Sequence, residues 1–243
     1  MGDERKTIVV IPAYNEAEAV ERTIKDFLDQ DYVDEVIVVD NGSTDGTGEI
    51  ARRTGVVVVD EPKKGYGHAL MRGMREALAR GADLVMLAEA DASFLARDGH
   101  KLLAYIDEVD MVFGSRATLE LIDKNAKWDR FLHYGNLFIA KFLQVCWWGK
   151  IRLTDVGCTL RLLTRNSVQT LLNSLSEGGS AFLVDLVTEA LIGRLRCVEI
   201  PVHYKERIGS SKITSNRLKS IRVGLRMLWI VLKKRFRRRR AAK

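Results

Sequence analysis

The sequence lacks several patterns that define whole classes of protein. Its three cysteines, Cys146, Cys158 and Cys197, form neither a CxxC pair nor a cluster with histidine. A disulfide framework and a zinc site are therefore excluded, and we expect buried thiols in a reducing cytoplasm. No apolar run reaches the ~18–20 residues needed to cross a bilayer. The charged start, Met1 to Lys6, lacks the apolar stretch of a signal peptide, so we expect a cytoplasmic chain.

Acidic residues are absent from the last part of the chain. From Arg207 onward there are 14 basic residues and no acidic one, whereas residues 1–206 hold 25 basic and 32 acidic side chains. The net charge of +7 therefore combines a mildly acidic body with a strongly basic end. This excludes a uniformly basic nucleic-acid-binding protein, and no nucleic acid is expected as a partner. The 47% content of hydrophobic residues excludes wholesale disorder.

Short apolar runs alternate with helical stretches in the first half of the chain. We expect strands at 8–11, 36–39, 56–59, 84–87 and 111–114, and helices at 16–28, 44–53 and 66–80. The runs do not alternate with polar residues, which indicates strands covered on both faces and hence an α/β fold with a mostly parallel sheet flanked by helices. The second half is expected to contain helices at 131–148 and 183–192, a strand at 198–204 and a long final helix.

Polar loops follow three of the predicted strands. They are Pro12–Glu16 after the first strand, Asp40–Gly46 after the second and Glu89–Ser93 after the fourth. Ligands bind beyond the carboxyl ends of the strands in such sheets, so these loops are expected to meet at one site. Glu89 and Asp91 suit a hard divalent cation, because Mg²⁺ takes one or two carboxylates together with substrate phosphates. Taken alone the pair would be solvated loop acids, but its position beside the other loops favours a cation site.

Two further segments have more than one interpretation. Asp40 at the end of a strand suits the ribose hydroxyls or base of a nucleotide, while Ser43 or Thr44 suits the N-cap of the next helix. The segment Lys63–Gly67 precedes a predicted helix, whose first amide groups favour anions. It has no Walker pattern, so a plain turn is expected there.

Six segments follow one another along most of the chain. They are Ile11–Glu16, Val38–Thr47, Glu89–Asp91, Phe113–Arg116, Thr154–Arg161 and Pro201–Lys212. Together they resemble the family-two inverting glycosyltransferases with the GT-A fold, in the polyprenol-phosphate branch typified by dolichol-phosphate mannosyltransferase. The resemblance implies a GT-A (Rossmann-like) fold. It also implies transfer, with inversion, of a sugar from a nucleotide-sugar donor to a polyprenyl (dolichyl or undecaprenyl) phosphate.

The resemblance also implies roles for individual residues. Glu89 and Asp91, in the place of the DxD motif, would hold Mg²⁺ or Mn²⁺ and the donor diphosphate. The nucleotide would be bound by Pro12, Ala13, Tyr14, Glu16, Asp40, Gly42, Glu89 and Ala90. The catalytic set would be Asp91, Arg116, Arg130, Asp155, Arg207 and Lys212. Within it, Arg116 and Arg130 would contact the acceptor phosphate, and Arg207 and Lys212 would close over the donor diphosphate or the acceptor phosphate.

The chain departs from this branch at two positions of the cation site, and the nature of the acceptor stays open. Glu89 replaces the usual aspartate, and Ser93 stands where glutamine is common. A lipid monophosphate is already ionised at neutral pH, because its second pKa is about 6, and it needs no general base. A hydroxyl acceptor such as a glycan would need a carboxylate base, for which Asp155 is the candidate; with a phosphate acceptor Asp155 has a positioning role. A third interpretation is an inactive nucleotide-binding adaptor at a membrane.

The basic end has an amphipathic pattern from Arg217 onward. Leu218, Ile221, Leu225, Leu228, Trp229, Leu232 and Phe236 fall on one side, and Lys219, Arg222, Arg226, Lys233 and Arg237 fall on the other. A helix of this kind lies in a membrane interface, where basic residues are attracted to anionic lipid. The alternative is that the apolar side packs on the body. The stretch 131–148, with two tryptophans at its end, is either a second interfacial surface or a buried helix.

We therefore expect two parts, a glycosyltransferase domain over residues 1–212 and an amphipathic basic helix and tail over residues 213–243. The expected partners are a nucleotide-sugar donor, a polyprenyl phosphate acceptor and an anionic membrane surface. The protein is expected to be peripheral on the cytoplasmic face of that membrane. The sugar, the nucleobase, the lipid length and the oligomeric state stay open.

Overall fold

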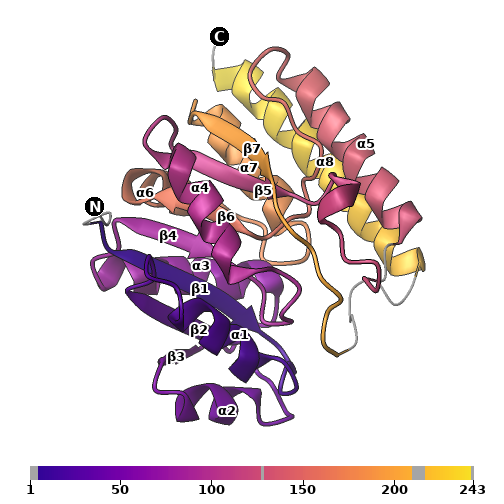
Figure 1. Ribbon diagram of the computed structural model, residues 1–243. Coiled ribbons are helices and arrows are strands. Elements are labelled where there is room, and N and C mark those ends of the chain that lie inside the picture. Colours follow the sequence, from indigo (N-terminus) through magenta and orange to yellow (C-terminus); the bar gives the residue numbers. More distant parts are fainter. Residues whose placement is uncertain (1–4, 127–128, 210–216, 242–243) are drawn as a thin grey trace.

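The computed structural model describes residues 5–126, 129–209 and 217–241. Seven strands form one sheet (Figure 1). They are β1 (Thr7–Ala13), β2 (Glu35–Asp40), β3 (Val57–Asp60), β4 (Leu84–Leu87), β5 (Met111–Ser115), β6 (Arg161–Thr164) and β7 (Cys197–Pro201). The helices are α1 (Val20–Leu28), α2 (Thr47–Arg53), α3 (Tyr66–Ala79), α4 (Gly99–Ile106), α5 (Arg130–Cys146), α6 (Arg165–Leu172), α7 (Phe182–Ile192) and α8 (Arg217–Ala241), with short 3₁₀ turns η1 (Ala96–Asp98) and η2 (Leu119–Leu121).

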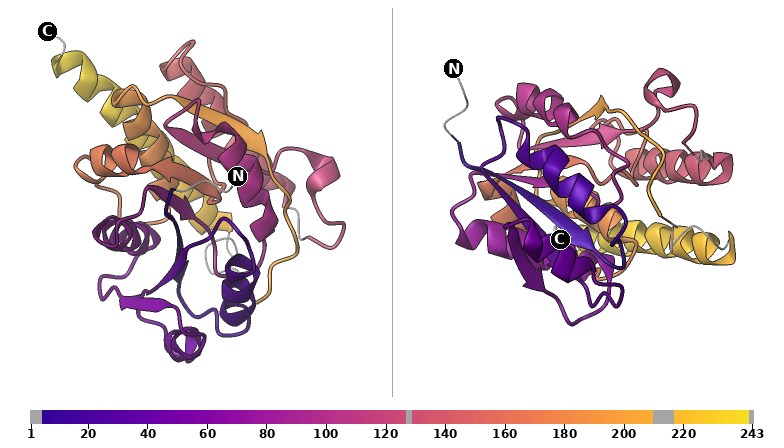
Figure 2. Two further views of the ribbon diagram at one scale, coloured as in Figure 1. Left: turned by 60° about the vertical axis from the view of Figure 1, so that its left-hand side comes forward. Right: turned by 60° about the horizontal axis from the view of Figure 1, so that its bottom comes forward.

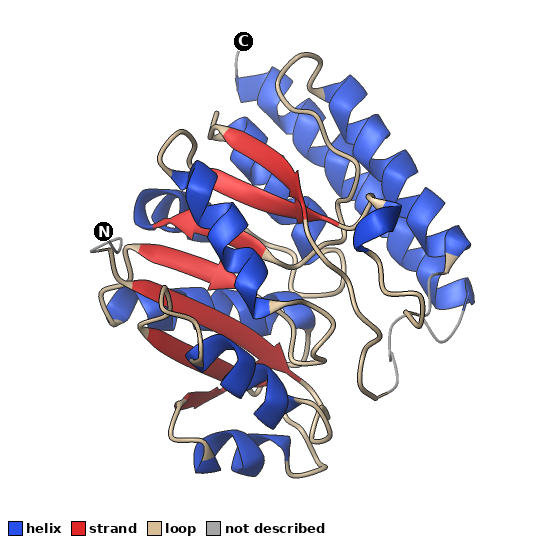
Figure 3. Ribbon diagram, in the orientation of Figure 1, coloured by secondary structure: helices blue, strands red, loops and turns tan. Residues whose placement is uncertain are grey.

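The sheet has the order β3-β2-β1-β4-β6-β5-β7. Strands β3, β2, β1 and β4 run parallel, and β6 is antiparallel to both of its neighbours, β4 and β5. Strand β7 pairs in parallel with β5. The predicted α/β fold with a mostly parallel sheet is thus confirmed. Because six strands share one direction, their carboxyl ends lie on the same side of the molecule (Figure 3).

Successive residues of β1 pack into two cores, one on each face of the sheet. Ile8 and Val10 join a core with α3, α6 and α7, and Val9 and Ile11 join a core with α1 and α4. All four side chains are fully buried. This two-sided burial is the reason why the strands read as continuous apolar runs.

The structure differs from the predicted elements mainly at loops that carry polar side chains. Helix α2 begins at Thr47 and not at residue 44, because Asp45 accepts the Thr47 amide and Gly46 has φ 88°. Ser43 is not an N-cap; its Oγ accepts the Asn15 amide at 3.0 Å and so joins two loops. The last predicted strand ends at Pro201 instead of residue 204. Strand β6 was not predicted; it has only four residues, and only its first, Arg161, belongs to one of the motifs noted in the sequence.

The thiols are only partly as expected. Cys158 is buried, whereas Cys146 and Cys197 are partly exposed, and all three are free. Within the described residues, no helix is long and apolar enough to cross a membrane.

Helix α8 packs on the body with a side that the amphipathic pattern did not indicate. It lies beside α5 and α7 at the outer edge of the molecule (Figures 1 and 2). Its buried residues are Met227, Ile230, Val231 and Lys234. The alternative that the apolar side packs on the body is wrong except at the partly buried Leu228, because Leu218, Ile221, Leu225, Trp229, Leu232 and Phe236 are exposed. Helix α5 likewise buries Ile139, Ala140 and Leu143 and exposes Phe131, Tyr134 and Phe138.

A buried ion cluster attaches α8 to α7. The Lys234 ammonium group contacts Asp185 and lies 2.5 Å from Glu189, and all three side chains are almost completely buried. Asp185 also accepts the amides of Ser176 and Glu177 in the loop before α7. One ammonium group therefore compensates two carboxylates that have little access to water. The predicted division of the chain at 212/213 stays a prediction, since that boundary lies in 210–216, outside the described residues.

Replacing Lys234 by methionine should lower the free energy of unfolding by about 3–5 kcal/mol, because it leaves buried carboxylates without their counter-ion. Chemical denaturation monitored by circular dichroism measures the change. Lys25→Met is the matched control, since the Lys25–Glu21 ion pair is exposed and its loss should change the free energy of unfolding far less. An unfolding free energy of Lys234→Met at or above that of the unmodified protein would contradict this assignment.

Candidate active site

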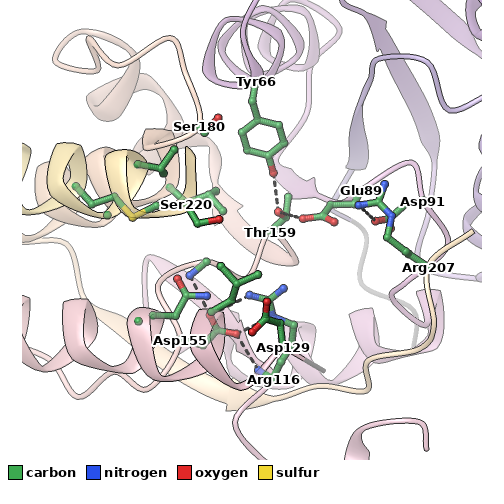
Figure 4. Close-up of a pocket in the computed structure, with 18 of the residues that line it drawn as sticks. Tyr66, Glu89, Asp91, Arg116, Asp129, Asp155, Thr159, Ser180, Arg207 and Ser220 are labelled. Atoms are coloured by element: carbon green, nitrogen blue, oxygen red, sulfur yellow. Dashed lines mark hydrogen bonds and ion pairs between the residues drawn. The ribbon is translucent and has the colours of Figure 1, made fainter. Parts of the chain in front are cut away.

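A cavity of about 1110 Å³ lies at the carboxyl ends of the central strands. Its wall combines the loop after β1, the loop after β4, the start of α3, the segment before β6, the chain that follows β7, and one side each of α5 and α8. Figure 4 shows its polar part, with Glu89 and Asp91 on one side and Arg116 with Asp155 on the other. Residues far apart in the sequence therefore meet at the predicted edge of the sheet.

The loops after β1 and β2 are joined by side-chain hydrogen bonds. Asn15 has φ 53° and its Oδ1 accepts the Thr44 amide at 2.8 Å, while the Glu16 amide donates to Thr47 Oγ1 at 2.8 Å. Asp40 accepts the Ser43 amide, and a Cβ on Gly48 would come within 2.3 Å of its carboxylate. A Cβ at position 48 would therefore require the Asp40 carboxylate to move. The hydrogen bonds join the two loops next to Tyr14 and Glu16, which line the cavity.

A chain segment after β7 crosses the cavity and supplies a positive charge to its acids; we call residues 202–209 the strap. The Lys205 amide donates to the Ser93 carbonyl at 2.7 Å, and the Ile208 amide donates to the Asp91 carbonyl at 3.0 Å. Arg207 lies 3.1 Å from Glu16 Oε1 and 3.5 Å from Asp91 Oδ2. The backbone of the strap is thus hydrogen-bonded to the loop after β4. The Arg207 guanidinium group lies between the Glu16 and Asp91 carboxylates.

Asp91 and Glu89 have different surroundings although they are two residues apart. Asp91 is buried, and its Oδ1 accepts the Ser93 amide at 3.0 Å. Glu89 accepts a hydrogen bond from Thr159 Oγ1 at 2.5 Å, and the Tyr66 hydroxyl lies 2.6 Å from the same Thr159 oxygen. Burial and, secondarily, the charge of Asp91 raise the pKa of Glu89 to about 7. Glu89 therefore changes its charge near neutral pH.

Asp155 and Arg116 form a planar, two-point ion pair. Arg116 Nε donates to Asp155 Oδ2 at 2.7 Å, and Nη2 donates to Oδ1 at 3.0 Å. The Gly157 amide also donates to Oδ1 at 2.9 Å. Burial disfavours the ionised form of Asp155, but Arg116 outweighs that effect and keeps the pKa of Asp155 below its usual value. Asp155 is therefore an ionised carboxylate that orients Arg116, and it is a poor proton acceptor.

The cavity gathers most of the predicted site residues. Its lining includes Pro12, Ala13, Tyr14, Glu16, Glu89, Ala90, Asp91, Arg116, Asp155 and Arg207. Asp40 and Gly42 are not in the lining; Asp40 is the last residue of β2, and Gly42 lies in the loop that follows it. Arg130 begins α5, but its side chain lies outside the described residues, as does the whole of Lys212. The roles assigned to these residues stay predictions.

Several polar residues of the lining were not predicted as site residues, among them Tyr66, Thr159 and Tyr204. Tyr66 lies in the Lys63–Gly67 segment, and Thr159 lies in the motif around Asp155, so each was in a segment that had been noted for another reason. Tyr204 has its ring 5.2 Å from the Arg116 guanidinium carbon. Only the fold brings these side chains together.

The residues present fit a shared divalent cation and not a cation held by protein alone. Among the described residues, no group of three histidine, cysteine, aspartate or glutamate side chains forms a ligand cluster. Glu89 and Asp91 supply two carboxylates, and Mg²⁺ commonly takes one or two carboxylates with the remaining positions filled by phosphate and water. The donor set therefore suits a cation that arrives with a diphosphate.

The chain is similar to known proteins in sequence and in fold. A model described as glycosyl transferase family 2 matches residues 8–172. The low-salt glycan biosynthesis hexosyltransferase Agl6 of Haloferax volcanii is 30% identical over 213 residues, which are 85% of this chain and 49% of that protein; this chain spans about half of its length. The undecaprenyl-phosphate mannosyltransferase of Micrococcus luteus is 28% identical over 220 residues, 86% of this chain and 88% of that protein.

Solved structures resemble the whole chain. Glucosyl-3-phosphoglycerate synthase from Mycobacterium tuberculosis, in complex with Mn²⁺, UDP-glucose and phosphoglyceric acid, gives a TM-score of 0.73 at 19% identity. The match covers 96% of this chain and 80% of that one. The same synthase has also been solved with Mg²⁺ and UDP. The likeness confirms the predicted GT-A fold.

Binding of a divalent cation should weaken as the pH falls through 7. Below its pKa of about 7 Glu89 is protonated, and a cation ligated by Glu89 must then displace that proton. We expect Mg²⁺ in the presence of UDP or GDP to bind roughly tenfold more weakly at pH 6 than at pH 8. Calorimetric titration at several pH values measures this, with Glu89→Gln as the control that loses the pH dependence. If the Mg²⁺ affinity of Glu89→Gln changed with pH as much as that of the unmodified protein, another group would be the one that titrates.

Proposed function

The chain belongs to glycosyl transferase family 2, and we propose that within this family it transfers a sugar from a nucleotide-sugar donor to a polyprenyl phosphate, with inversion, at a membrane surface. As a member of that family it is a glycosyltransferase using nucleotide sugars. The acceptor and the membrane are the new elements of the proposal. The relative from Micrococcus luteus, whose name states undecaprenyl phosphate, points in the same direction.

The observation that carries the proposal is the shape of the cavity beyond its acids. It continues from Asp91 and Arg116 into a groove between α5 and α8. Apolar residues of both helices line this groove, namely Phe131, Leu132, Phe138, Ile139, Ile221, Val223, Leu225, Met227 and Leu228. Gly135 and Gly224 also line it, and a Cβ on either would meet no atom within 4 Å. A polar end that opens into an apolar groove matches a phosphate that carries a hydrocarbon chain.

Four of these lining residues, Phe131, Phe138, Ile221 and Leu225, are also exposed at the surface. We call this surface the outer face; it consists of Phe131, Tyr134, Phe138, Val145 and Trp148 near α5 and Leu218, Ile221, Leu225, Trp229, Leu232 and Phe236 on α8, each 40–83% exposed. Soluble monomers rarely expose apolar patches of such extent unless a membrane or partner covers them. Arg226 and Lys233 lie within 4.8 Å of the Trp229 ring, so cations flank the aromatic residue. This arrangement suits an interface with anionic lipid.

The state of Asp155 favours a phosphate acceptor over a hydroxyl acceptor. A hydroxyl group would need a carboxylate base, but both oxygens of Asp155 accept hydrogen bonds and its pKa is lowered. A lipid phosphate is already ionised and needs only alignment. Arg116, held flat by Asp155, has the geometry for that task, because a guanidinium group binds phosphate through paired donors.

The proposed reaction needs no proton transfer. An oxygen of the acceptor phosphate forms a bond to the anomeric carbon on the face opposite the nucleotide, and the bond from that carbon to the donor diphosphate breaks. The electron pair leaves with the nucleoside diphosphate. A divalent cation at Asp91 would supply charge neutralisation to this leaving group. Arg207, which lies against Asp91 and Glu16, is placed to add a second positive charge there.

Incubation with a panel of radiolabelled nucleotide sugars, undecaprenyl phosphate and Mg²⁺ or Mn²⁺ tests the proposal. We expect label from one donor to enter the organic phase, and we expect Asp91→Ala to abolish this transfer with an unchanged melting temperature. Asp60→Ala, which removes an exposed carboxylate at the end of β3, is the control. Near-normal, metal-dependent turnover by Asp91→Ala would remove the central claim.

The same assay separates the alternative acceptors. Asp155→Asn should lower the transfer rate and raise the KM for the lipid phosphate, because it loosens Arg116, while the pH profile keeps its shape. Loss of nearly all activity together with loss of the acidic limb of the profile would instead identify Asp155 as a base for a hydroxyl acceptor. Absence of transfer from every donor would favour the nucleotide-binding adaptor.

Sedimentation with vesicles that contain anionic phospholipid tests the outer face. We expect the protein to co-sediment at low salt and the Trp229→Gln/Leu232→Gln variant to stay largely in the supernatant, because it removes apolar area that would enter the interface. Leu119→Gln is the control, since Leu119 is a single exposed apolar residue on η2. Failure of the unmodified protein to co-sediment would contradict membrane association.

A further inference from the structure

Three residues of the cavity wall form a continuous hydrogen-bonded chain. Tyr66 comes from the first turn of α3, Thr159 from the segment before β6, and Glu89 from the loop after β4. The oxygen atoms lie 2.6 Å apart from Tyr66 to Thr159 and 2.5 Å apart from Thr159 to Glu89. All three residues line the cavity, and Thr159 is fully buried. The chain is therefore fixed in place, with Tyr66 and Glu89 at its two ends.

The direction of the hydrogen bonds determines what this wall can bind. The Thr159 hydroxyl has one proton, which it donates to the Glu89 carboxylate. Tyr66 must then be the donor to Thr159, because the Thr159 oxygen has only lone pairs left for it. What remains for a ligand is acceptor capacity, at the Tyr66 oxygen and at the Glu89 carboxylate. A wall of acceptors suits a ligand with several hydroxyl donors.

The position of these three hydrogen-bonded residues relates them to the sugar of the donor. Glu89 is two residues from Asp91, where the donor diphosphate is proposed to bind, so a group attached to that diphosphate would lie near them. Arg116, the proposed contact of the acceptor phosphate, lies on the other side of the cavity (Figure 4). The hydrogen-bonded residues therefore lie on the side of the cavity where the donor, and not the acceptor phosphate, is proposed to bind.

The length of Glu89 is part of the arrangement. An aspartate at this position would be shorter by one methylene group. The glutamate extends to Thr159, and the contact places the carboxylate in the cavity wall. The glutamate therefore links the acidic motif to a hydroxyl group that an aspartate would approach less closely.

We propose that Tyr66, Thr159 and Glu89 form a hydroxyl-reading wall that recognises the sugar of the nucleotide-sugar donor and determines which hexose is accepted. The inference rests on the proposed function for the identity of the donor. In this proposal the wall selects among epimers, which differ only in the direction of one hydroxyl group. A site built to hydrogen-bond a hydroxyl discriminates strongly, because a misplaced hydroxyl leaves buried polar groups unpaired.

Calorimetric titration with Mn²⁺ and epimer pairs that share one nucleotide tests the wall without any acceptor. The probes are UDP-glucose with UDP-galactose, GDP-mannose with GDP-glucose, and UDP and GDP alone. We expect the unmodified protein to prefer one epimer, and Thr159→Val and Tyr66→Phe to reduce that preference by about tenfold. Both variants should bind the sugar-free nucleoside diphosphate as the unmodified protein does. Glu89→Asp should show the same loss of preference and still require Mn²⁺, since it retains a carboxylate.

Matched controls separate the wall from general effects of lost hydroxyl groups. Thr188→Val removes a buried hydroxyl that bonds within α7, and Tyr32→Phe removes one that bonds to the Ala96 carbonyl. Neither residue lines the cavity, and both variants should keep the preference. Equal weakening of all sugar nucleotides and of UDP or GDP in the wall variants would overturn the proposal, as would an absence of epimer preference in the unmodified protein. Because no lipid is present, these outcomes are independent of whether polyprenyl phosphate is the acceptor.

Discussion

The mutual repulsion of carboxylates at one edge of the sheet is the constraint on which the site depends. The loops after β1 and β4 bring Glu16, Glu89 and Asp91 into a single cavity, and the segment before β6 adds Asp155. Burial makes an unpaired negative charge costly there. Two arginines compensate the acids: Arg207 bridges Glu16 and Asp91, and Arg116 neutralises Asp155. Glu89, which has a hydroxyl partner in Thr159, is left with a raised pKa. Glu89 is thus held by a hydroxyl group, whereas Glu16, Asp91 and Asp155 each have an arginine partner.

The basic end of the chain takes part in this compensation instead of forming a separate tail. Arg207 reaches the acids through the strap, and Lys234 is buried against Asp185 and Glu189 of α7. Helix α8 contacts the body through the side that carries Met227, Ile230, Val231 and Lys234. Most of its other large apolar residues are therefore exposed. The basic residues of this end therefore lie in three places: at the site, in the core and on the surface.

The parts of the fold that follow from local patterns could be predicted from the sequence, and the parts that depend on long-range contacts could not. Continuous apolar runs such as Ile8–Ile11 identified the buried strands, since two-sided burial leaves a local pattern. The acids at 89 and 91 followed from their place after a strand. Thr159 and Tyr66 did not, because their importance lies in a contact over 93 residues of sequence. The packed side of α8 was misjudged because Lys234, a charged residue, belongs to it, and only its acidic partners on α7 make that burial possible.

The loop before α7 contacts both α8 and the first turn of α3. Its Ser176 and Glu177 amides bond to Asp185, which holds Lys234 of α8, and Glu177 itself pairs with Arg226. One residue further on, the Gly178 carbonyl accepts the His68 amide in the first turn of α3, beside Tyr66. A path of short polar contacts therefore connects the helix with the exposed apolar side to the helix that carries the Tyr66 hydroxyl. A change in the length of this loop would therefore alter contacts of α8 and of the first turn of α3 at once.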